Sequence, residues 1–301
     1  MGSVFVIGDL NVDVLCRTGR LPKKGEEIHA ESIGFSIGGN AANFAVVLGR
    51  LGAGPEFYSC MGNDFSSEFL RGELERAGVK QRLKEVTATN GVTVCTVFPE
   101  GERGFISNKG ASGMLRVQDI RPILKNVKPG DIVYSGGLFH LPGLARGFAG
   151  FLRDARKKGA TVMLDYTFDE TGCSGSFRDI ATQLDMVFLN ERELEAFGNG
   201  KKAFSKLSGM GIRDIIVKLG ARGSLFCTNG MVKKEPARKV KALDTTGAGD
   251  VFNAGFVYGF MSGFLPEQCL RLGNWMAAWK VGKSGLQTPP REKVSDFVKK
   301  L

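Results

Sequence analysis

A chain of 301 residues with 43% hydrophobic residues is long enough to bury a large core, and its 42 glycines are spread along the chain instead of forming low-complexity tracts. The formal net charge is +10, but lysines and arginines are dispersed, in pairs such as Lys23-Lys24 and Lys157-Lys158. Dispersed charge favours a basic surface that attracts small anions over a nucleic-acid-binding protein, in which clustered cations are typical.

Cysteine and histidine usage indicates a cytoplasmic protein with reduced thiols. The two histidines and six scattered cysteines form no metal-ligand pattern; the cysteines are Cys16, Cys60, Cys95, Cys173, Cys227 and Cys269. The first apolar run begins at Val4 with no charged segment before it, which is atypical of a signal peptide. No stretch approaches about 20 apolar residues, so we expect no membrane span.

In chain order, short apolar runs alternate with segments of helical periodicity. The runs have the length of buried strands and lie at 4–7, 56–59, 132–134, 161–164, 186–189 and 215–217. Such alternation is typical of an α/β fold in which helices cover both faces of a mostly parallel sheet. The C-terminal part has helical periodicity and no linker-like tract divides the chain, so we expect a single α/β domain over residues 1–301.

Two half-polar segments, at about 14–36 and 91–108, interrupt this alternation. The second has strand-like alternation at Val92, Val94, Thr96 and Phe98, followed by a turn at 100–102. We expect the two insertions to form a small separate sheet that acts as a lid over the carboxyl edge of the main sheet. The same lid is the expected surface for a homodimer.

The segment 244–250, with the sequence DTTGAGD, comes directly before a segment with the apolar spacing of a buried helix. Small residues ahead of a helix leave backbone N–H groups bare, and the helix dipole favours negative charge there. The amides of Gly247, Ala248 and Gly249 therefore predict an anion hole for a phosphoryl group.

Asp250 follows this anion hole in the first helical turn. A carboxylate beside phosphate is electrostatically unfavourable unless it accepts a proton from an attacking hydroxyl, so Asp250 is the candidate general base. The alternative from the residue alone is an acid that merely complements the helix dipole.

A second phosphate-like motif lies at 277–284, one residue away from the P-loop pattern. A P-loop needs a strand, a glycine-rich turn and a helix, whereas residues 270–281 have helical periodicity and the first glycine is absent. We interpret this match as coincidence.

Two signatures together resemble the ribokinase-like (PfkB-type) carbohydrate kinases. Residues 244–259 resemble the C-terminal signature of that family, and residues 38–43 (GGNAAN), with the helix to Gly52, resemble its N-terminal signature. The resemblance covers essentially the whole chain. It implies a ribokinase-like central sheet flanked by helices, with a small β-sheet lid.

The resemblance assigns the acceptor side to residues near the N-terminus. Asn11 and Asp13, within Gly8–Asp13 after the first strand, are similar to the opening that binds sugar hydroxyls in the family. From the residues alone, Asp13 is equally explained as a turn residue.

The physical reading of the N-terminal signature agrees with acceptor binding. Gly38 and Gly39 let the backbone approach a ligand, and Asn40 and Asn43 project from one face of a helix start with donors and acceptors for hydroxyls. Helix capping by Asn40 is the structural alternative.

The nucleotide side is likewise assigned by resemblance. Asn190 and Glu193 resemble an Asn-x-x-Glu element that organises Mg²⁺ and phosphate mainly through water, and Asn274 lies on a helix that flanks the base in relatives. Residues 218–223 resemble the nucleotide-side turn, with Lys218, Gly220 and Gly223 as binding residues, although lysine stands at 218 where threonine is frequent.

The sequence also departs from the family at 165–169. Many relatives carry an Asp-Pro-Asn or Asn-Pro turn there, and this chain has DYTFD. The departure leaves the substrate subgroup open but does not touch the residues expected to perform the chemistry.

The implied function is an enzyme that transfers the terminal phosphoryl group of a nucleotide, ATP by expectation, to a hydroxyl of a sugar-like acceptor with Mg²⁺ as cofactor. The resemblance further implies a monovalent-cation site, for K⁺, at Asp244 and Thr246. A catalytically silent sugar or nucleotide sensor and a nucleic-acid-binding protein are the alternatives of a different class.

The acceptor and the donor nucleotide stay open at this stage. A nucleoside needs an apolar slot, for which Phe105 and Phe139 are candidates; a sugar phosphate needs cations in the lid, for which Arg103 and Lys109 are candidates.

Overall fold

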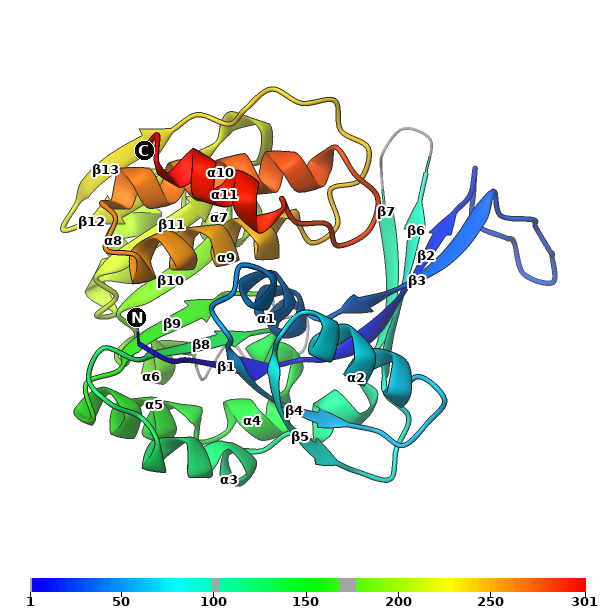
Figure 1. The fold of residues 1–301 in the computed structure, drawn as a ribbon, viewed down its shortest axis with the longest axis horizontal. Helices are drawn as coiled ribbons and strands as arrows, with labels where there is room; N and C mark the ends of the chain where they lie inside the picture. Colours follow the sequence, from blue (N-terminus) through cyan, green and yellow to red (C-terminus); the bar gives the residue numbers. More distant parts are fainter. Residues whose placement is uncertain (1, 99–102, 168–176) are drawn as a thin grey trace.

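The computed structural model of the protein describes residues 2–98, 103–167 and 177–301. Cys173, the expected turn at 100–102 and the last two residues of the segment 165–169 lie outside these ranges. Figure 1 shows a large layered body from which a smaller sheet projects on one side. Across the described ranges, no helix has both the length and the apolar character needed to cross a bilayer.

A nine-stranded sheet forms the centre of the large body, in the order β13-β12-β11-β10-β9-β8-β1-β4-β5. Neighbours from β5 to β11 run parallel, and β12 and β13 pair antiparallel at one edge. The six strands predicted from apolar runs are all confirmed. The strands are β1 (Val4–Gly8), β4 (Glu56–Met61), β5 (Lys80–Glu85), β8 (Ile132–Gly136), β9 (Thr161–Asp165), β10 (Met186–Asn190), β11 (Asp214–Lys218), β12 (Ser224–Thr228) and β13 (Met231–Glu235).

Helices cover both faces of this sheet, which explains why its central strands are apolar at nearly every position. In β1, Val4 and Val6 belong to one core, whereas Phe5 and Ile7 point to the other. The first core is closed by α1 (Asn40–Arg50), α2 (Ser67–Arg76), α9 (Ala248–Met261), α10 (Pro266–Val281) and α11 (Arg291–Val298). The second is closed by α3 (Val117–Ile120), α4 (Pro142–Ala145), α5 (Phe148–Lys157), α6 (Phe177–Ala181), α7 (Glu191–Glu195) and α8 (Lys201–Gly209).

The expected small separate sheet is also present. It has the order β3-β2-β6-β7, formed by β2 (Asn11–Arg17), β3 (Ser32–Gly38), β6 (Gly91–Val97) and β7 (Arg103–Asn108). Strand pairing begins at Asn11 and runs to Gly38, beyond the expected limits of the first insertion. We refer to these four strands as the small sheet; Figure 1 shows them to the right of the main body.

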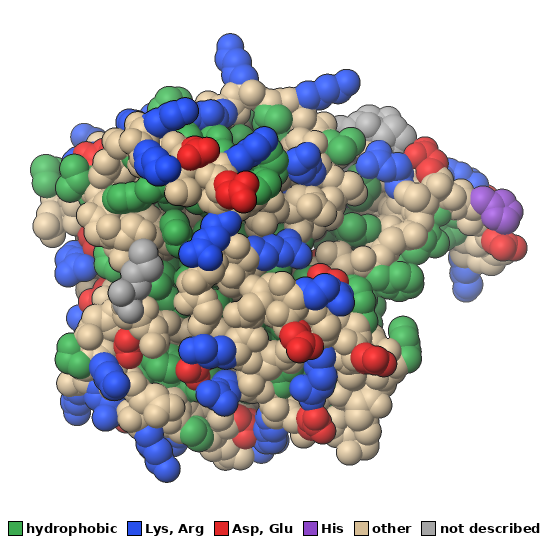
Figure 2. Space-filling model, in the orientation of Figure 1, with side chains coloured by type: hydrophobic (Ala, Val, Ile, Leu, Met, Phe, Trp, Pro, Cys, Tyr) green, Lys and Arg blue, Asp and Glu red, His purple; other side chains and the backbone are tan. Residues whose placement is uncertain are grey.

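The C-terminal helices follow the expected pattern. Residues 277–281 form the last turns of α10, so the P-loop-like stretch lacks the strand and turn that a P-loop requires. On the face drawn in Figure 2, Lys and Arg side chains are interspersed with Asp and Glu.

Candidate active site

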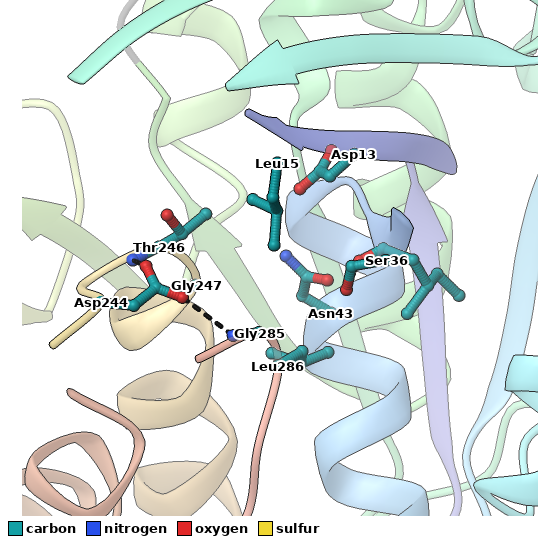
Figure 3. A pocket seen from close by; sticks show the side chains of 10 residues that line it. Asp13, Leu15, Ser36, Asn43, Asp244, Thr246, Gly247, Gly285 and Leu286 are labelled. Atoms are coloured by element: carbon teal, nitrogen blue, oxygen red, sulfur yellow. Dashed lines mark hydrogen bonds between the residues drawn. The ribbon is translucent and has the colours of Figure 1, made fainter. Parts of the chain in front are cut away.

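The candidate site lies at the carboxyl edge of the parallel strands, where α1, the start of α9 and the small sheet meet. In Figure 3, Asp13 and Leu15 extend from β2, Asn43 extends from α1, and Thr246 and Gly247 lie on the loop before α9. The pocket between them is lined by Asp13, Leu15, Ser36, Ile37, Asn43, Asp244, Thr246, Gly247, Gly285 and Leu286. Segments more than 200 residues apart thus contribute to one pocket, and five of the predicted site positions (13, 43, 244, 246 and 247) line it.

The anion hole predicted at the start of α9 has the backbone geometry for that role. Gly247 precedes the helix with a φ of 72°, a left-handed conformation that glycine adopts without strain. Its carbonyl accepts the Val251 N–H at 3.0 Å, and the Ala248 N–H donates to the Thr245 carbonyl at 3.2 Å. The first N–H groups of a helix have no partner within the helix, so this turn can offer donors to an anion. The predicted Ala248 amide is the exception, because its N–H already donates to the Thr245 carbonyl.

Asp250 is buried beside this turn. Its Oδ2 accepts a hydrogen bond from the Asn43 Nδ2 at 2.8 Å. Burial raises the pKa of the Asp250 carboxyl well above its ordinary value, and the nearby Asp165 carboxylate adds to that rise. A carboxylate made more basic in this way is better suited to accept a proton than an exposed one.

Lys218 brings a buried cation to the same place. It ends β11 and reaches across β10 to Asp165 at the end of β9, with 2.8 Å between Nζ and Oδ1. Burial opposes its charged form, but the Asp165 and Glu193 carboxylates outweigh that effect and raise its pKa. A Cβ atom added to Gly249 would lie 3.5 Å from this ammonium group, so Lys218 borders the anion hole.

On the acceptor side, Asp13 lies in the middle of β2 and pairs with Ser36 of β3, so its interpretation as a turn residue is wrong. Its carboxylate lies over Gly38, where an added Cβ would be 1.9 Å from Oδ1, and only glycine leaves this space. Burial and then the neighbouring Asp9 raise the pKa of Asp13 to about 7. Among the residues that the structure describes, the buried Oδ1 atoms of Asn11 and Asn43 have no hydrogen-bond partner.

The helix that carries Asn40 and Asn43 is capped by Asp9, not by Asn40. The Asp9 Oδ1 accepts the Ala41 N–H at 2.9 Å, and Gly39 is the residue before the first helical turn. This capping role of Asp9 was missed by sequence reasoning, although an Asp directly after the first strand was the available signal.

The residues predicted for the nucleotide side have partners within the protein. Asn190 and Glu193 form a capping box at the start of α7: the Glu193 N–H donates to Asn190 Oδ1 at 2.8 Å, and the Asn190 N–H donates to Glu193 Oε2 at 2.7 Å. Asn190 lies opposite Lys218 in the sheet register.

The turn after β11 has glycine at two positions with positive φ, and the late helix α10 contacts the chain after β13. Gly220 and Gly223 both have left-handed backbone conformations around a short 3₁₀ turn. Asn274 on α10 donates to the carbonyls of Glu235 and Pro236 at 3.1 and 3.4 Å, so its side chain anchors the chain after β13.

The Asp244 carboxylate, which lines the pocket, is bound by four donors. Oδ1 accepts the Thr246 N–H at 2.9 Å and lies 3.2 Å from Arg103 Nη2; Oδ2 accepts Lys280 Nζ at 2.8 Å and the Gly285 N–H at 3.0 Å. The last of these bonds is dashed in Figure 3. Burial alone would raise the pKa of Asp244, but the hydrogen bonds from Lys280 and Thr246 lower it.

Arg103 joins the small sheet to this loop. Besides Asp244, its Nη1 donates to Thr246 Oγ1 at 2.7 Å. Of the other lid candidates, Lys109 is the residue before the short 3₁₀ turn that follows β7, and Phe105 is 59% exposed on β7. Phe139 is fully buried and packs against Tyr166 and Phe177, so it does not line the pocket.

Lys280 had no place in the sequence analysis, yet its side chain is fully buried and its Nζ contacts both the backbone carbonyl and Oδ2 of Asp244. The signal was present: Lys280 continues the buried face of α10, four residues after Met276.

A helix start with backbone donors, a buried basic carboxylate and polar side chains across the pocket form an arrangement that suits transfer of a phosphoryl group to an alcohol. The fold and the site together define a small-molecule kinase. Comparison with known proteins agrees: residues 1–293 match the profile described as pfkB family carbohydrate kinase. The chain therefore belongs to the pfkB family of carbohydrate kinases, phosphotransferases that act on an alcohol group.

Individual relatives match over nearly their full length. The chain is 26% identical to a ribokinase of Haemophilus influenzae (98% of each chain covered) and 30% identical to an ATP-dependent ribose-1-phosphate kinase of Halopiger xanaduensis (96% of this chain, 95% of the relative).

Solved structures share the fold. A ribokinase from Thermotoga maritima is 30% identical with a TM-score of 0.82 (99% and 100% covered). An Arabidopsis thaliana ribokinase complexed with ribose and ATP is 24% identical with a TM-score of 0.82 (99% of each). A putative ribokinase II from E. coli in complex with ATP and Mg²⁺ is 20% identical with a TM-score of 0.84 (100% of each).

Proposed function

We propose that this kinase transfers the γ-phosphoryl group of ATP to a hydroxyl of a small neutral sugar, with Asp250 as the general base. The observation that carries the proposal is the buried Asp250 carboxylate, held by Asn43 between the start of α9 and the pocket that Asp13 lines. Residues in or beside this pocket have suitable chemistry for proton transfer, for stabilising the phosphoryl charge and for binding the acceptor.

The proton-transfer step is assigned to Asp250. The acceptor hydroxyl gives its proton to the carboxylate as its oxygen attacks the γ-phosphorus, and the bond from phosphorus to the bridging oxygen of ADP breaks. The hydrogen bond from Asn43 orients the carboxylate, and burial keeps it basic. A base and a hydroxyl fixed at hydrogen-bond distance also save the entropy of bringing them together.

Charge on the transferring group is stabilised by the anion hole and by Lys218. The amides at the start of α9 face the phosphoryl oxygens, and the Lys218 ammonium, next to Gly249, contributes a full positive charge from the nucleotide side. Asp165 holds Lys218 in place through the 2.8 Å ion pair. Lys218 thus takes the position at which a neutral threonine is frequent in the family, and it does so with an added charge.

Mg²⁺ fits the site as a largely hydrated ion bound by the nucleotide. Asn190 and Glu193 offer hard oxygen donors at the end of β10, and no cluster of three or more metal-ligating side chains occurs in the described part of the chain. When bound, Mg²⁺ neutralises phosphate charge. The residues around it orient the phosphates through water, and Gly220 and Gly223 shape the turn that borders the nucleotide.

The acceptor is assigned as neutral because of how the charges of the pocket are already used. Arg103, a cation of the small sheet, is bonded to Thr246 and Asp244, which line the pocket. Asp13 brings a carboxylate to the pocket, and its negative charge would repel the phosphate of a sugar phosphate. Donation by acceptor hydroxyls would satisfy Asp13 and the unpartnered Oδ1 atoms of Asn11 and Asn43.

The small sheet is assigned two further roles. Its inner face, with Asp13 and Leu15, closes over the acceptor and excludes water, which would otherwise compete as phosphoryl acceptor.

The outer face of the small sheet exposes Ile33, Phe35 and Ile106 at 62%, 64% and 69%, an apolar surface suited to a second copy of the chain. Phe35→Glu should therefore convert a dimer to a monomer in sedimentation analysis; a wild-type monomer would refute the dimer.

An assay of the phosphorylated acceptor, which forms from any donor, tests the function. Neutral pentoses and hexoses, their phosphates and nucleosides would each be combined with ATP, ADP or GTP in the presence of Mg²⁺. The proposal predicts turnover with ATP and a neutral sugar. Higher kcat/KM for a sugar phosphate or a nucleoside would overturn the acceptor class, and binding of sugar without turnover under any donor would favour a silent sensor.

A further inference from the structure

The monovalent-cation site expected at Asp244 and Thr246 does not fit the residues present. A carboxylate has about four lone-pair positions, and Asp244 uses them for four donors: two amides, Arg103 and Lys280. Its backbone carbonyl, the other ligand this residue can offer, accepts Lys280 Nζ at 2.8 Å. The Thr246 hydroxyl accepts from Arg103 at 2.7 Å. The oxygens expected to hold a cation are thus occupied by ammonium and guanidinium groups.

We infer that the Lys280 ammonium group replaces the monovalent cation and makes this kinase independent of K⁺. An ammonium ion and a potassium ion are similar in size and charge, and both are bound by carbonyl and carboxylate oxygens. Lys280 is fully buried near the end of α10, and its Nζ ends between two oxygens of one residue. The charge is therefore a permanent part of the fold and needs no uptake from solution.

The position of Lys280 connects it to the anion hole. Asp244 lies three residues before Gly247, and its Oδ1 fixes the Thr246 N–H in the turn that leads into α9. The N–H groups of Leu243 and Asp244 both donate to the Val281 carbonyl, next to Lys280, at 2.8 and 3.1 Å. Lys280 thus holds one end of the loop whose other end presents the anion-hole amides, so it is a positioning residue and does not touch the substrates.

The first experiment measures wild-type kcat in potassium, sodium and tetramethylammonium chloride at equal ionic strength. Because this part of the inference rests on the proposed function, melting temperatures are measured in the same salts, which need no acceptor substrate. The inference predicts that kcat differs by less than twofold among the salts. It also predicts that the melting temperature is the same in all of them within error. Activation by potassium of about tenfold, the size expected if an organising charge were missing, would overturn it.

Variants at 280 separate charge from packing. Lys280→Met keeps most of the side-chain volume but removes the charge, whereas Lys280→Ala removes both and leaves room for an ion. We expect kcat to fall at least tenfold in both. Added potassium or ammonium should restore activity and raise the melting temperature of Lys280→Ala only, because the methionine side chain fills the space. Lys283→Ala, at an exposed lysine three residues on, is the matched control and should behave as wild type.

A merely structural role for Lys280 predicts a different pattern. If only its volume mattered, Lys280→Met would retain wild-type kcat, Lys280→Ala would be impaired, and no cation would change either; that pattern would refute the inference. If Lys280→Ala fails to fold, the wild-type salt series and Lys280→Met still decide. If the wild type phosphorylates no acceptor, the proposed function fails, while the effect of potassium on the melting temperatures still tests the cation replacement.

Discussion

Asp13→Asn tests the acceptor side, because the structure predicts opposite effects on stability and on binding. The pKa of Asp13 is about 7 in the folded protein against an ordinary value of 3.8. A carboxyl whose pKa is raised by folding contributes stability that is fully present below pH 3.8 and is lost as the pH rises through about 7. Above pH 7, the folded protein therefore carries an unfavourable buried charge.

The size of this effect follows from the shift. A pKa change from 3.8 to about 7 corresponds to about 4 kcal/mol at full weight, and partial exposure of Asp13 reduces the expected value to about 1–2 kcal/mol. Asn is nearly the same size as a protonated Asp. Asp13→Asn should therefore raise the free energy of unfolding by about 1–2 kcal/mol at pH 8 and change it little at pH 4 to 5.

Binding should change in the other direction. Loss of a buried charge-assisted hydrogen bond costs about 1.5–3 kcal/mol, so the acceptor KM should rise roughly ten- to hundredfold while the KM for ATP stays within twofold. The assays are urea denaturation at both pH values and steady-state kinetics, with the exposed Asp296→Asn as control. A destabilised variant at pH 8, or equal rises in both KM values, would show that Asp13 serves the fold and not the acceptor.

Three further predictions concern the nucleotide side and the core. Gly249→Val should lower kcat at least tenfold in a folded protein, because its side chain displaces Lys218. Circular dichroism checks the fold and steady-state kinetics give kcat. A normal kcat would place the phosphate elsewhere. Lys218→Met should lower kcat ten- to a hundredfold. The double variant with Asp165→Asn should regain the melting temperature of the wild type but not its kcat. If both are regained, the ion pair has a purely structural role. Gly273→Val should cost about 1–3 kcal/mol in urea denaturation, since an added Cβ would lie 2.9 Å from Phe252; an unchanged unfolding free energy would refute the close packing of α9 on α10.

The fold was largely predictable because its central strands are buried on both faces. Strands such as β1 and β10 are apolar at nearly every position, so their runs are visible in the sequence without knowledge of the neighbours. The small sheet was predictable from its half-polar alternation, but its limits were not, since Asn11 joins it by pairing with Gly38 and Gly91, which lie far along the chain.

The candidate site was predictable where local sequence determines geometry. Gly247 and Asp250 lie within one helix start, and that short range fixes their relation. The pairs Lys280 with Asp244 and Arg103 with Thr246 join residues 36 and 143 positions apart, so only the packing of α10 and the small sheet against the loop brings them together. A lysine on the apolar face of a helix is an ambiguous signal until its partner is known.

The central claim is that Asp250 is the base for phosphoryl transfer, and kcat of Asp250→Asn at saturating ATP and acceptor tests it most directly. Asn preserves the size of the side chain but cannot take the proton, so kcat should fall by about three orders of magnitude while calorimetry shows ATP and acceptor still binding. A folded Asp250→Asn variant that retains more than about a tenth of wild-type kcat would contradict the account, because general-base catalysis is commonly worth 10²–10⁴ in rate.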